Sequence, residues 1–295
     1  MSVELGQLLT AQGDVITSAQ ALTFLTRREL EAHVNRGHLH KVWYGIYGRG
    51  EVTASLRLRG LDLATGTTVA ACMGTAAAAY GFDTERTQHL HVLNPAGHRL
   101  RSAEGLVVHR SADAPLAWVA GRPVTTPAWT AIEVARGLRR ARALATLDAA
   151  LRSGTCSRDE LEKAIELHAG RRGIAHTREL LGLASPLAES PMESEARLVM
   201  IDGGLPTPTL QHQVVDLRGD VWRLDFAWPE LRVAAEYDGV DWHSGPDAFV
   251  RDRRRNTALQ DLRWVVVPII ADDVRRRPAE LVDRIDRRLQ NARAA

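Results

Sequence analysis

Three carboxylates stand close together in residues 224–239, a stretch with the alternating pattern of a β-hairpin. Asp225 lies on the first predicted strand, and Glu236 and Asp238 lie on the second. If residues 229–232 form the loop without a bulge, Asp225 stands directly opposite Glu236, with the two Cβ atoms about 5 Å apart. Asp238 then lies two residues further along on the same face. The pattern indicates an acidic site on one face of a hairpin.

Two carboxylates that face each other repel, so this pairing does not stabilise a sheet by itself. A divalent cation turns the repulsion into binding, because hard ions such as Mg²⁺ are held by one or two carboxylates together with phosphate oxygens. The small residues Ala227 and Ala234 beside the carboxylates leave room for a substrate. The alternative is a solvated or ion-paired outer face, since the same register places Arg223 opposite Asp238. Spacing alone leaves both interpretations open.

An ordered set of residues surrounds the hairpin, from about residue 186 to residue 295. It consists of Ser190-Pro191-Met192-Glu193-Ser194-Glu195, Gly204-Leu205-Pro206, Asp225-x-Ala227-Trp228-Pro229, Glu236-Tyr237-Asp238-Gly239, His243, Asp252-Arg253-x-Arg255, Leu259 and Trp264. This set resembles the PD-(D/E)xK superfamily of restriction-endonuclease-like domains, and within it a family related to the very-short-patch-repair endonucleases. The resemblance implies Mg²⁺-dependent phosphodiester hydrolysis, in which Asp225 and Glu236 hold the ion and lower the pKa of a bound water.

The resemblance also implies roles for three further residues. Asp238 assists as a metal ligand or positions the water, Glu193 reaches the ion through water, and His243 protonates the leaving group, as a histidine can near neutral pH. For Glu193 a structural interpretation is equally open. Ser190-Pro191-Met192-Glu193 is a capping box with proline at the first helical position, which is a sufficient reason for the glutamate.

The chain departs from the superfamily pattern at the motif lysine. Two residues after Glu236 it has Asp238, and its only lysines, Lys41 and Lys163, lie outside this region. In the superfamily that lysine orients the water or stabilises charge near the phosphate. The positive groups nearby are Arg251, Arg254 and His243. An arginine cannot be deprotonated to act as a base, so the fold is better supported than the activity.

A helix expected from Pro246 to Leu262 is rich in arginine. Its arginines lie on the side opposite Phe249, Ala258, Leu259 and Leu262, where they are positioned to meet a phosphate backbone. The predicted DNA-binding residues here are Arg251, Arg254 and Arg255. The alternative is a solvated helix face, which is the usual meaning of such a charge run.

Residues 3–47 are predicted to form three short helices and two short strands. Thr26 caps the third helix, from Arg27 to Asn35, and Gly37 ends it before the strands within residues 38–47. The residues that carry a resemblance are Ile16-Thr17, Arg36-Gly37-x-Leu39 and Gly45-Ile46-Tyr47. This order resembles the winged helix-turn-helix at the start of the antitoxin family of abortive-infection, type IV, toxin–antitoxin pairs.

The basic residues of this segment cluster on the elements that touch DNA in helix-turn-helix proteins. The second helix of the pair enters the major groove with its N-terminal residues at base edges, so Arg27 and Arg28 are the predicted readers. Arg36, His38 and Lys41 are expected nearer to phosphate. Winged helices also serve as protein–protein modules, and this alternative stays open.

Residues 51–185 resemble the rest of the same antitoxin family. The elements expected in this region are a small-residue helix at 70–81, strands at 90–93, 106–110 and near 123–124, and helices near 128–136, 141–151, 157–168 and 173–181. His89, His91 and His109 fall on or beside strands. A zinc site is conceivable, but core or surface histidines are favoured, because no cysteine or carboxylate lies at ligand spacing with them.

Composition restricts the class of protein but not its activity. A formal net charge of +2 over 295 residues does not by itself indicate nucleic-acid binding. Cys72 and Cys156 have no metal-ligand spacing, which indicates reduced thiols in the cytosol. There is no secretory signal pattern and no run of about 20 strongly apolar residues. We therefore expect a cytoplasmic protein with no membrane segment, and the excess of arginine over lysine is typical of a bacterial genome rich in GC.

The sequence predicts a multi-domain α/β (α+β) protein. Residues 1–50 form a winged helix-turn-helix DNA-binding domain, residues 51–185 an antitoxin-like α/β region, and residues 186–295 a restriction-endonuclease-like α/β domain. The predicted function is DNA binding joined to a Mg²⁺-dependent endonuclease. The alternative is a non-enzymatic transcriptional regulator or antitoxin, whose nuclease-like domain only binds DNA or a partner such as a cognate toxin. The absent motif lysine favours the alternative, and the three carboxylates of the hairpin favour the enzyme.

Overall fold

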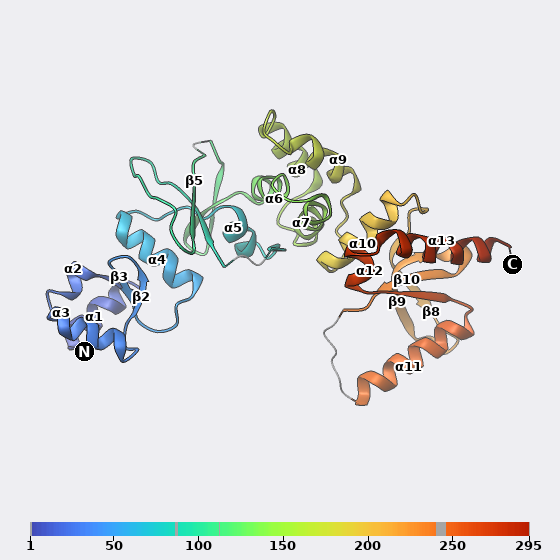
Figure 1. Cartoon of the computed structure of the whole chain (residues 1–295), viewed down its shortest axis with the longest axis horizontal. Helices are drawn as coiled ribbons and strands as arrows, with labels where there is room; N and C mark the ends of the chain where they lie inside the picture. Colours follow the sequence, from blue (N-terminus) through green and yellow to red (C-terminus); the bar gives the residue numbers. More distant parts are fainter. Residues whose placement is uncertain (1, 86–87, 112, 240–245, 295) are drawn as a thin grey trace. The chain divides into compact units, whose positions relative to one another are not determined.

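A computed structural model of the chain describes residues 2–85, 88–111, 113–239 and 246–294, with the side chains of 246–250 excepted. The chain forms two compact units, Met1–Thr130 and Ala131–Ala295 (Figure 1). Its fold is mixed α/β, as predicted. Within the described residues, no helix combines the length and the apolar character needed to cross a membrane. The predicted domain boundaries after residues 50 and 185 stay predictions, and each lies inside one unit.

The first unit begins with a module of three helices and a small sheet. Its elements are α1 (Val3–Ala11), β1 (Val15–Thr17), α2 (Ser18–Ala21), α3 (Arg27–Asn35), β2 (His40–Trp43) and β3 (Ile46–Gly48). β3 lies in the middle of the sheet and pairs antiparallel with β1 and β2. Leu5, Leu9, Leu30 and Leu39 pack together as its core. The order of three helices followed by the β2–β3 hairpin is the one predicted for residues 3–47, where this hairpin is the expected wing, and β1 is an additional strand.

Helix α4 (Ala54–Thr65) connects this module to the remainder of the first unit. Leu56 packs with residues of the β1–β3 sheet, whereas Leu58 and Leu61 pack with the strands that follow. The following elements are α5 (Met73–Ala79), the parallel pair β4 (Leu90–Leu93) and β5 (Leu106–His109), and the antiparallel pair β6 (Leu116–Val119) and β7 (Arg122–Thr125). Backbone bridges from Ala71 to Val92 and Val124 join the two pairs.

Four elements lie outside the set that the sequence predicts, namely β1, β6, α4 and α12 (Ala271–Arg275). In α4, leucine alternates with arginine over residues 56–59, and this pattern by itself favours a strand. The segment is helical because the Leu56 N–H donates to Thr53 Oγ1 at its start and a left-handed Gly66 ends it. The leucines of α4 lie on two sides of the helix because α4 packs between two cores.

The second unit contains a helical part and a C-terminal sheet. Its helical part consists of α6 (Pro127–Ala135), which begins in the first unit, α7 (Arg140–Arg152), α8 (Arg158–Leu167), α9 (Ile174–Leu183) and α10 (Pro191–Asp202). A buried ion pair joins α7 to α10, with Arg197 Nη2 2.7 Å from Asp148 Oδ2. Asp148 also accepts the Ser185 N–H at 2.7 Å, and Arg197 donates to the Leu183 carbonyl oxygen at 2.6 Å. The segment before α10 is therefore bonded to α7 through the Ser185 N–H.

The sheet of the second unit has the strand order β11-β10-β9-β8. The strands are β8 (Thr209–Val215), β9 (Val221–Trp228), β10 (Val233–Tyr237) and β11 (Val265–Ile269), with β10 and β11 parallel and the other neighbours antiparallel. A 3₁₀ turn, Pro229–Leu231, joins β9 to β10 as the predicted loop. Helices α10 and α13 (Pro278–Ala294) pack on one side of the sheet, and α11 (Pro246–Asp261) lies on the other (Figure 1).

A second charged cluster joins α6 to the end of α8. His168 Nε2 lies 2.8 Å from Glu133 Oε2, and Arg136 Nε donates to the same oxygen at 2.8 Å. Burial alone would raise the pKa of Glu133, but the hydrogen bonds from His168 and Arg136 outweigh burial and lower this pKa to about 2. The carboxylate of Glu133 is thus stabilised in its charged form.

We expect Asp148→Ala to lower the free energy of unfolding by about 3–5 kcal/mol, because it leaves the Arg197 guanidinium buried without its carboxylate. Chemical denaturation followed by far-UV circular dichroism measures this change. The control is Arg140→Ala, which removes the partly exposed pairs with Glu179 and Asp202 and is expected to cost less than about 1 kcal/mol for each pair. Equal losses in the two variants would contradict a special role for the buried pair.

Glu133 predicts a specific loss of stability in acid. Since its folded-state pKa lies below the ordinary 4.5, its interactions contribute fully above about pH 4.5 and are lost as the pH falls towards about 2. The difference in unfolding free energy between wild type and Glu133→Gln should therefore shrink across this window in a series of denaturation curves. The control variant is Glu162→Gln, which changes an exposed glutamate of α8. A wild-type–variant difference that stays constant with pH would refute the assignment.

Candidate DNA interface and acidic cluster

Helix α3 presents its first residues to solvent. The Glu29 N–H donates to Thr26 Oγ1 at 3.3 Å, and the Thr26 N–H donates to Glu29 Oε2 at 2.8 Å, which is a reciprocal capping box. Leu30 is buried in the core of the module, so the opposite side of the helix is free of packing. Arg27 and Arg28 are exposed at the N-terminal end of α3, where residues of a recognition helix reach base edges.

The wing carries further basic and aromatic groups. Arg36 follows α3 directly, and Lys41 lies on β2, both with exposed side chains. Lys41 Nζ lies 5.9 Å from the centroid of the Tyr44 ring at the tip of the β2–β3 hairpin. Tyr44 is 96% exposed. An exposed aromatic ring beside a lysine is well suited to contact a nucleic acid.

A groove of about 610 Å³ separates α3 from the wing. Residues from α2, α3, β2 and β3 line it, including Ser18, Arg27, Glu31, Asn35, Lys41 and Tyr47. Two of the predicted DNA-binding residues, Arg27 and Lys41, thus line the same groove. Its polar and charged lining gives this surface hydrogen-bond donors and acceptors as well as positive charge.

In the second unit, β9 and β10 pair in the predicted register, with the partners Trp228–Val233, Ala227–Ala234 and Phe226–Ala235. The recorded ladder ends there. Instead of a backbone pair between Asp225 and Glu236, the Tyr237 N–H donates to Asp225 Oδ2 at 3.0 Å. On β8, Gln211 has a φ of 51° at the position where Asp225 would pair, so the ladder between β8 and β9 is also interrupted at this point.

Glu193 on α10 contributes a third carboxylate. Ser190 Oγ accepts the Glu193 N–H at 3.1 Å, as the predicted cap requires. The Glu193 side chain does not complete the box, because its Oε2 accepts the N–H of Glu189 at 2.8 Å and Nε2 of Gln211 at 3.1 Å. The contact with Gln211 directs this carboxylate towards β8. The structure thus confirms the Ser190 half of the predicted capping box, and a role of Glu193 in a metal site stays a prediction.

We call Glu193, Asp225 and Glu236 the acidic cluster. Burial raises the pKa of each of the three carboxyl groups. The charge of Asp225 raises the pKa of both Glu193 and Glu236 further, while the Tyr237 N–H partly offsets burial at Asp225. Asp225 therefore repels both glutamates in a partly desolvated place.

Arg255 of α11 neutralises one member of the acidic cluster. Its Nη1 donates to Glu236 Oε2 at 2.8 Å, and its Nη2 donates to Oε1 of the same carboxylate. The predicted pairing of Arg223 with Asp238 is wrong. Arg223 instead forms an ion pair with Glu189, with Nη2 and Oε2 2.6 Å apart. Asp238 is exposed beyond the end of β10, and its N–H donates to the Ile269 carbonyl oxygen at 2.7 Å. The predicted general acid, His243, lies outside the described residues.

The predicted Mg²⁺ ligands are Asp225 and Glu236. Mutual repulsion in the acidic cluster favours a cation. The placement of the side chains does not, because Arg255 bonds both carboxylate oxygens of Glu236. No group of three or more histidine, cysteine or acidic residues is placed to hold a metal ion in the described part of the chain. As placed, these residues fit a guanidinium rather than a hard divalent cation, and Mg²⁺ at Asp225 and Glu236 stays a prediction.

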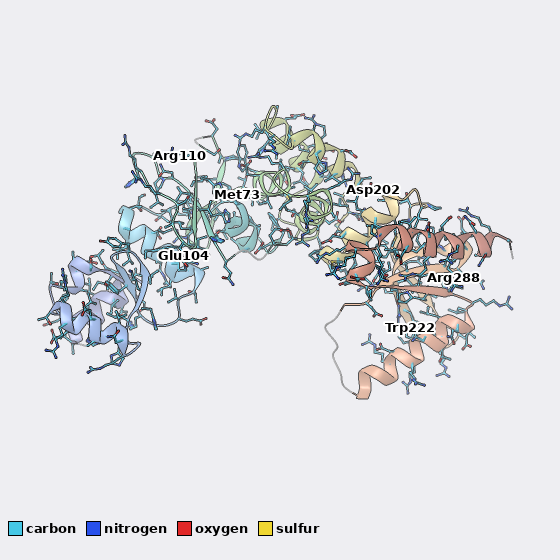
Figure 2. All side chains as sticks on the ribbon, in the orientation of Figure 1. Met73, Glu104, Arg110, Asp202, Trp222 and Arg288 are labelled. Atoms are coloured by element: carbon cyan, nitrogen blue, oxygen red, sulfur yellow. The ribbon has the colours of Figure 1, made fainter. Side chains whose placement is uncertain are left out.

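Arg253 and Arg254 of α11 line a second groove, of about 560 Å³, between this helix and the β8–β9 turn. Its lining includes Arg218, Trp222, Arg253 and Arg254, together with Asp216 and Asp261. Trp222 lies on the side of the sheet near α11 (Figure 2). Arg251 and Arg254 are exposed, as their predicted contact with phosphate requires, whereas Arg255 is turned to the sheet.

Two of the three predicted strand histidines, His91 and His109, form a stacked pair. His91 Nδ1 lies 2.9 Å from His109 Nε2, and the rings stack with centroids 5.2 Å apart. Burial and the neighbouring His109 lower the pKa of His91 to about 4. A neutral ring at His91 is consistent with the interpretation of these residues as structural.

The sequence did not predict the roles of two residues that contact the acidic cluster, Gln211 and Arg255. Gln211 donates to Glu193, and no local pattern distinguishes this glutamine from other polar strand residues. The contact of Arg255 with Glu236 could have been predicted from the position of Arg255 on the helix. Arg255 precedes the buried Leu259 by one helical turn, so it belongs to the inward face of α11.

Comparisons with known proteins place the chain in a family. Residues 69–183 match the family described as the AbiEi antitoxin C-terminal domain. Two proteins of Mycobacterium tuberculosis, the uncharacterized protein MT2308 of strain CDC 1551 / Oshkosh and the uncharacterized protein Rv2248 of strain ATCC 25618 / H37Rv, are each 54% identical to it over 271 residues. The match covers 92% of this chain and 100% of each relative. The chain thus belongs to the same protein family as these two mycobacterial proteins, and its residues 69–183 are similar to the AbiEi antitoxin C-terminal domain.

Proposed function

We propose that this protein is a DNA-binding transcriptional regulator of the antitoxin type. The observation that carries the proposal is the match of residues 69–183 to an antitoxin domain, directly behind a module with the element order of a winged helix. In that module Arg27 and Arg28 stand exposed at the capped start of α3. A regulator needs sequence recognition and a partner-responsive region, and these two segments supply both.

The recognition step uses the first unit. Helix α3 enters the major groove, where Arg27 and Arg28 reach base edges, because arginine bonds guanine through two donors. Arg36 and Lys41 lie against phosphates on either side, and these contacts supply affinity that depends on salt. Arg251 and Arg254 of α11 give the second unit its own surface for phosphate.

The protein partner of this regulator is a cognate toxin. Support comes from the description of the matched family as an antitoxin. A gene for a nucleotidyltransferase toxin next to the gene for this chain would add independent support. A protein–protein use of the winged helix alone is the competing interpretation, and the DNA-binding measurement below separates the two.

We expect the double variant Arg27→Ala, Arg28→Ala to bind DNA at least about tenfold more weakly than wild type, because each lost base contact costs about 1–3 kcal/mol. Fluorescence anisotropy with a labelled duplex from upstream of the chain's own gene measures affinity over a series of salt concentrations. Arg293→Ala, an exposed arginine of α13, is the control. No binding by wild type at low salt would refute the proposal, and unchanged binding by the double variant would refute the role of α3.

A second candidate function is a metal-dependent nuclease in the second unit. It is favoured by the raised pKa values of Glu193, Asp225 and Glu236, since a divalent cation would relieve their repulsion. Asp225 and Glu236 would hold Mg²⁺ once Arg255 had left Glu236. The absent motif lysine and the bond to Arg255 make this the weaker candidate.

The nuclease candidate predicts nicking of supercoiled plasmid by purified protein in Mg²⁺ or Mn²⁺ and none in EDTA. Both Asp225→Ala and Glu236→Ala should abolish it, because each removes a metal ligand. Agarose electrophoresis of the plasmid forms gives the result, with Asp261→Ala as the matched carboxylate control. Nicking that persists in both variants would exclude the acidic cluster as its source.

A further inference from the structure

Arg255 differs from its neighbours in α11 in where its side chain lies. Arg251, Arg253 and Arg254 are exposed, whereas 22% of the Arg255 side chain is accessible. Arg255 and the buried Leu259 are one turn apart, so both belong to the face of α11 that packs on the sheet. An arginine placed on a packing face must find a carboxylate or carbonyl partner there.

Three hydrogen bonds hold the guanidinium in place. Two of them join its terminal nitrogens to the two carboxylate oxygens of Glu236, which is the bidentate geometry that suits a guanidinium and a carboxylate. In the third, Arg255 Nη2 donates to the carbonyl oxygen of Arg223 on β9 at 3.1 Å. Arg255 thus connects α11 to β9 and β10, and it is positioned by the backbone as well as by charge.

The remaining carboxylates of the acidic cluster already have donors. Asp225 accepts the Tyr237 N–H, and Glu193 accepts the Glu189 N–H and the Gln211 amide. A hard cation needs carboxylate oxygens as ligands, so it reaches Glu236 only by displacing Arg255. A guanidinium also keeps its proton at every ordinary pH, so the pair is not released by a change of pH near neutrality.

We propose that Arg255 is the resident counter-ion of the acidic cluster and competes directly with divalent cations for Glu236. This inference deepens the proposed function, on which it rests, by giving a physical reason for a nuclease-like domain that works as a binding module. Arg255 acts as a positioning residue, because it holds Glu236 in place and takes no part in any reaction. It donates hydrogen bonds and neutralises charge, but it cannot polarise a water as a metal ion does.

The test is a calorimetric titration of the full chain with Mn²⁺ at mildly alkaline pH. We expect Arg255→Gln to bind Mn²⁺ on the order of tenfold more tightly than wild type, because Glu236 becomes available to the ion. The matched control is Arg288→Gln, an exposed arginine of α13, which should bind Mn²⁺ as wild type does. The double variant Glu236→Gln, Arg255→Gln should lose the gain, because it lacks the carboxylate that Arg255 releases.

The proposal is overturned if folded Arg255→Gln binds Mn²⁺ no more tightly than wild type, or if the gain persists in the double variant. Should Arg255→Gln fail to fold, Arg255→Lys decides the matter. Its compact ammonium keeps the charge without the bidentate fork, so an intermediate gain supports the proposal and an unchanged affinity overturns it. Because the readout is metal binding, its failure is distinct from a failure of wild type to bind DNA.

Discussion

Burial of carboxylates is the physical constraint on which the second unit depends. A charged carboxylate taken out of water costs free energy unless a positive group or several donors replace its hydration. Arginine meets this need for Asp148, which pairs with Arg197, and for Glu236, which pairs with Arg255. The chain has 38 lysines and arginines but only two lysines, so these pairs have the planar fork of arginine rather than a point charge. Helices and sheet are joined through these forks as well as through apolar contacts.

The acidic cluster shows what happens where that pairing is incomplete. Glu193 and Asp225 receive hydrogen bonds from backbone N–H groups and from Gln211, and burial raises the pKa of both. Arg255, which bonds Glu236, reduces the negative charge of the cluster but does not provide ligands for a metal ion. The residues that make the region resemble a nuclease are therefore also compatible with a domain that binds DNA or a protein without cleaving it. The bond from Arg255 to Glu236 is the feature that distinguishes such a binding domain from a metal-dependent nuclease.

The two units divide the work of a regulator of the proposed kind. The first unit offers a capped helix with two exposed arginines at its start and a wing with an exposed tyrosine at its tip. The match to the antitoxin domain, residues 69–183, extends over parts of both units, and in the second unit the segment before α10 is bonded to α7. Because α7 and α10 share a buried ion pair, the helices α7 to α10 and the C-terminal sheet form one compact unit.

Local signals in the sequence determined much of this architecture by themselves. The boundaries of α3 followed from Thr26 and Glu29, and the register of β9 and β10 followed from the alternation on either side of Pro229, because capping and pleating act over a few residues. Elements that depend on distant partners were missed, among them β1 and α4. The tertiary structure alone decided the partner of Glu236. Hydrogen-bonding between side chains far apart in sequence depends on which helix face packs on which strand, and only the folded chain brings those faces together.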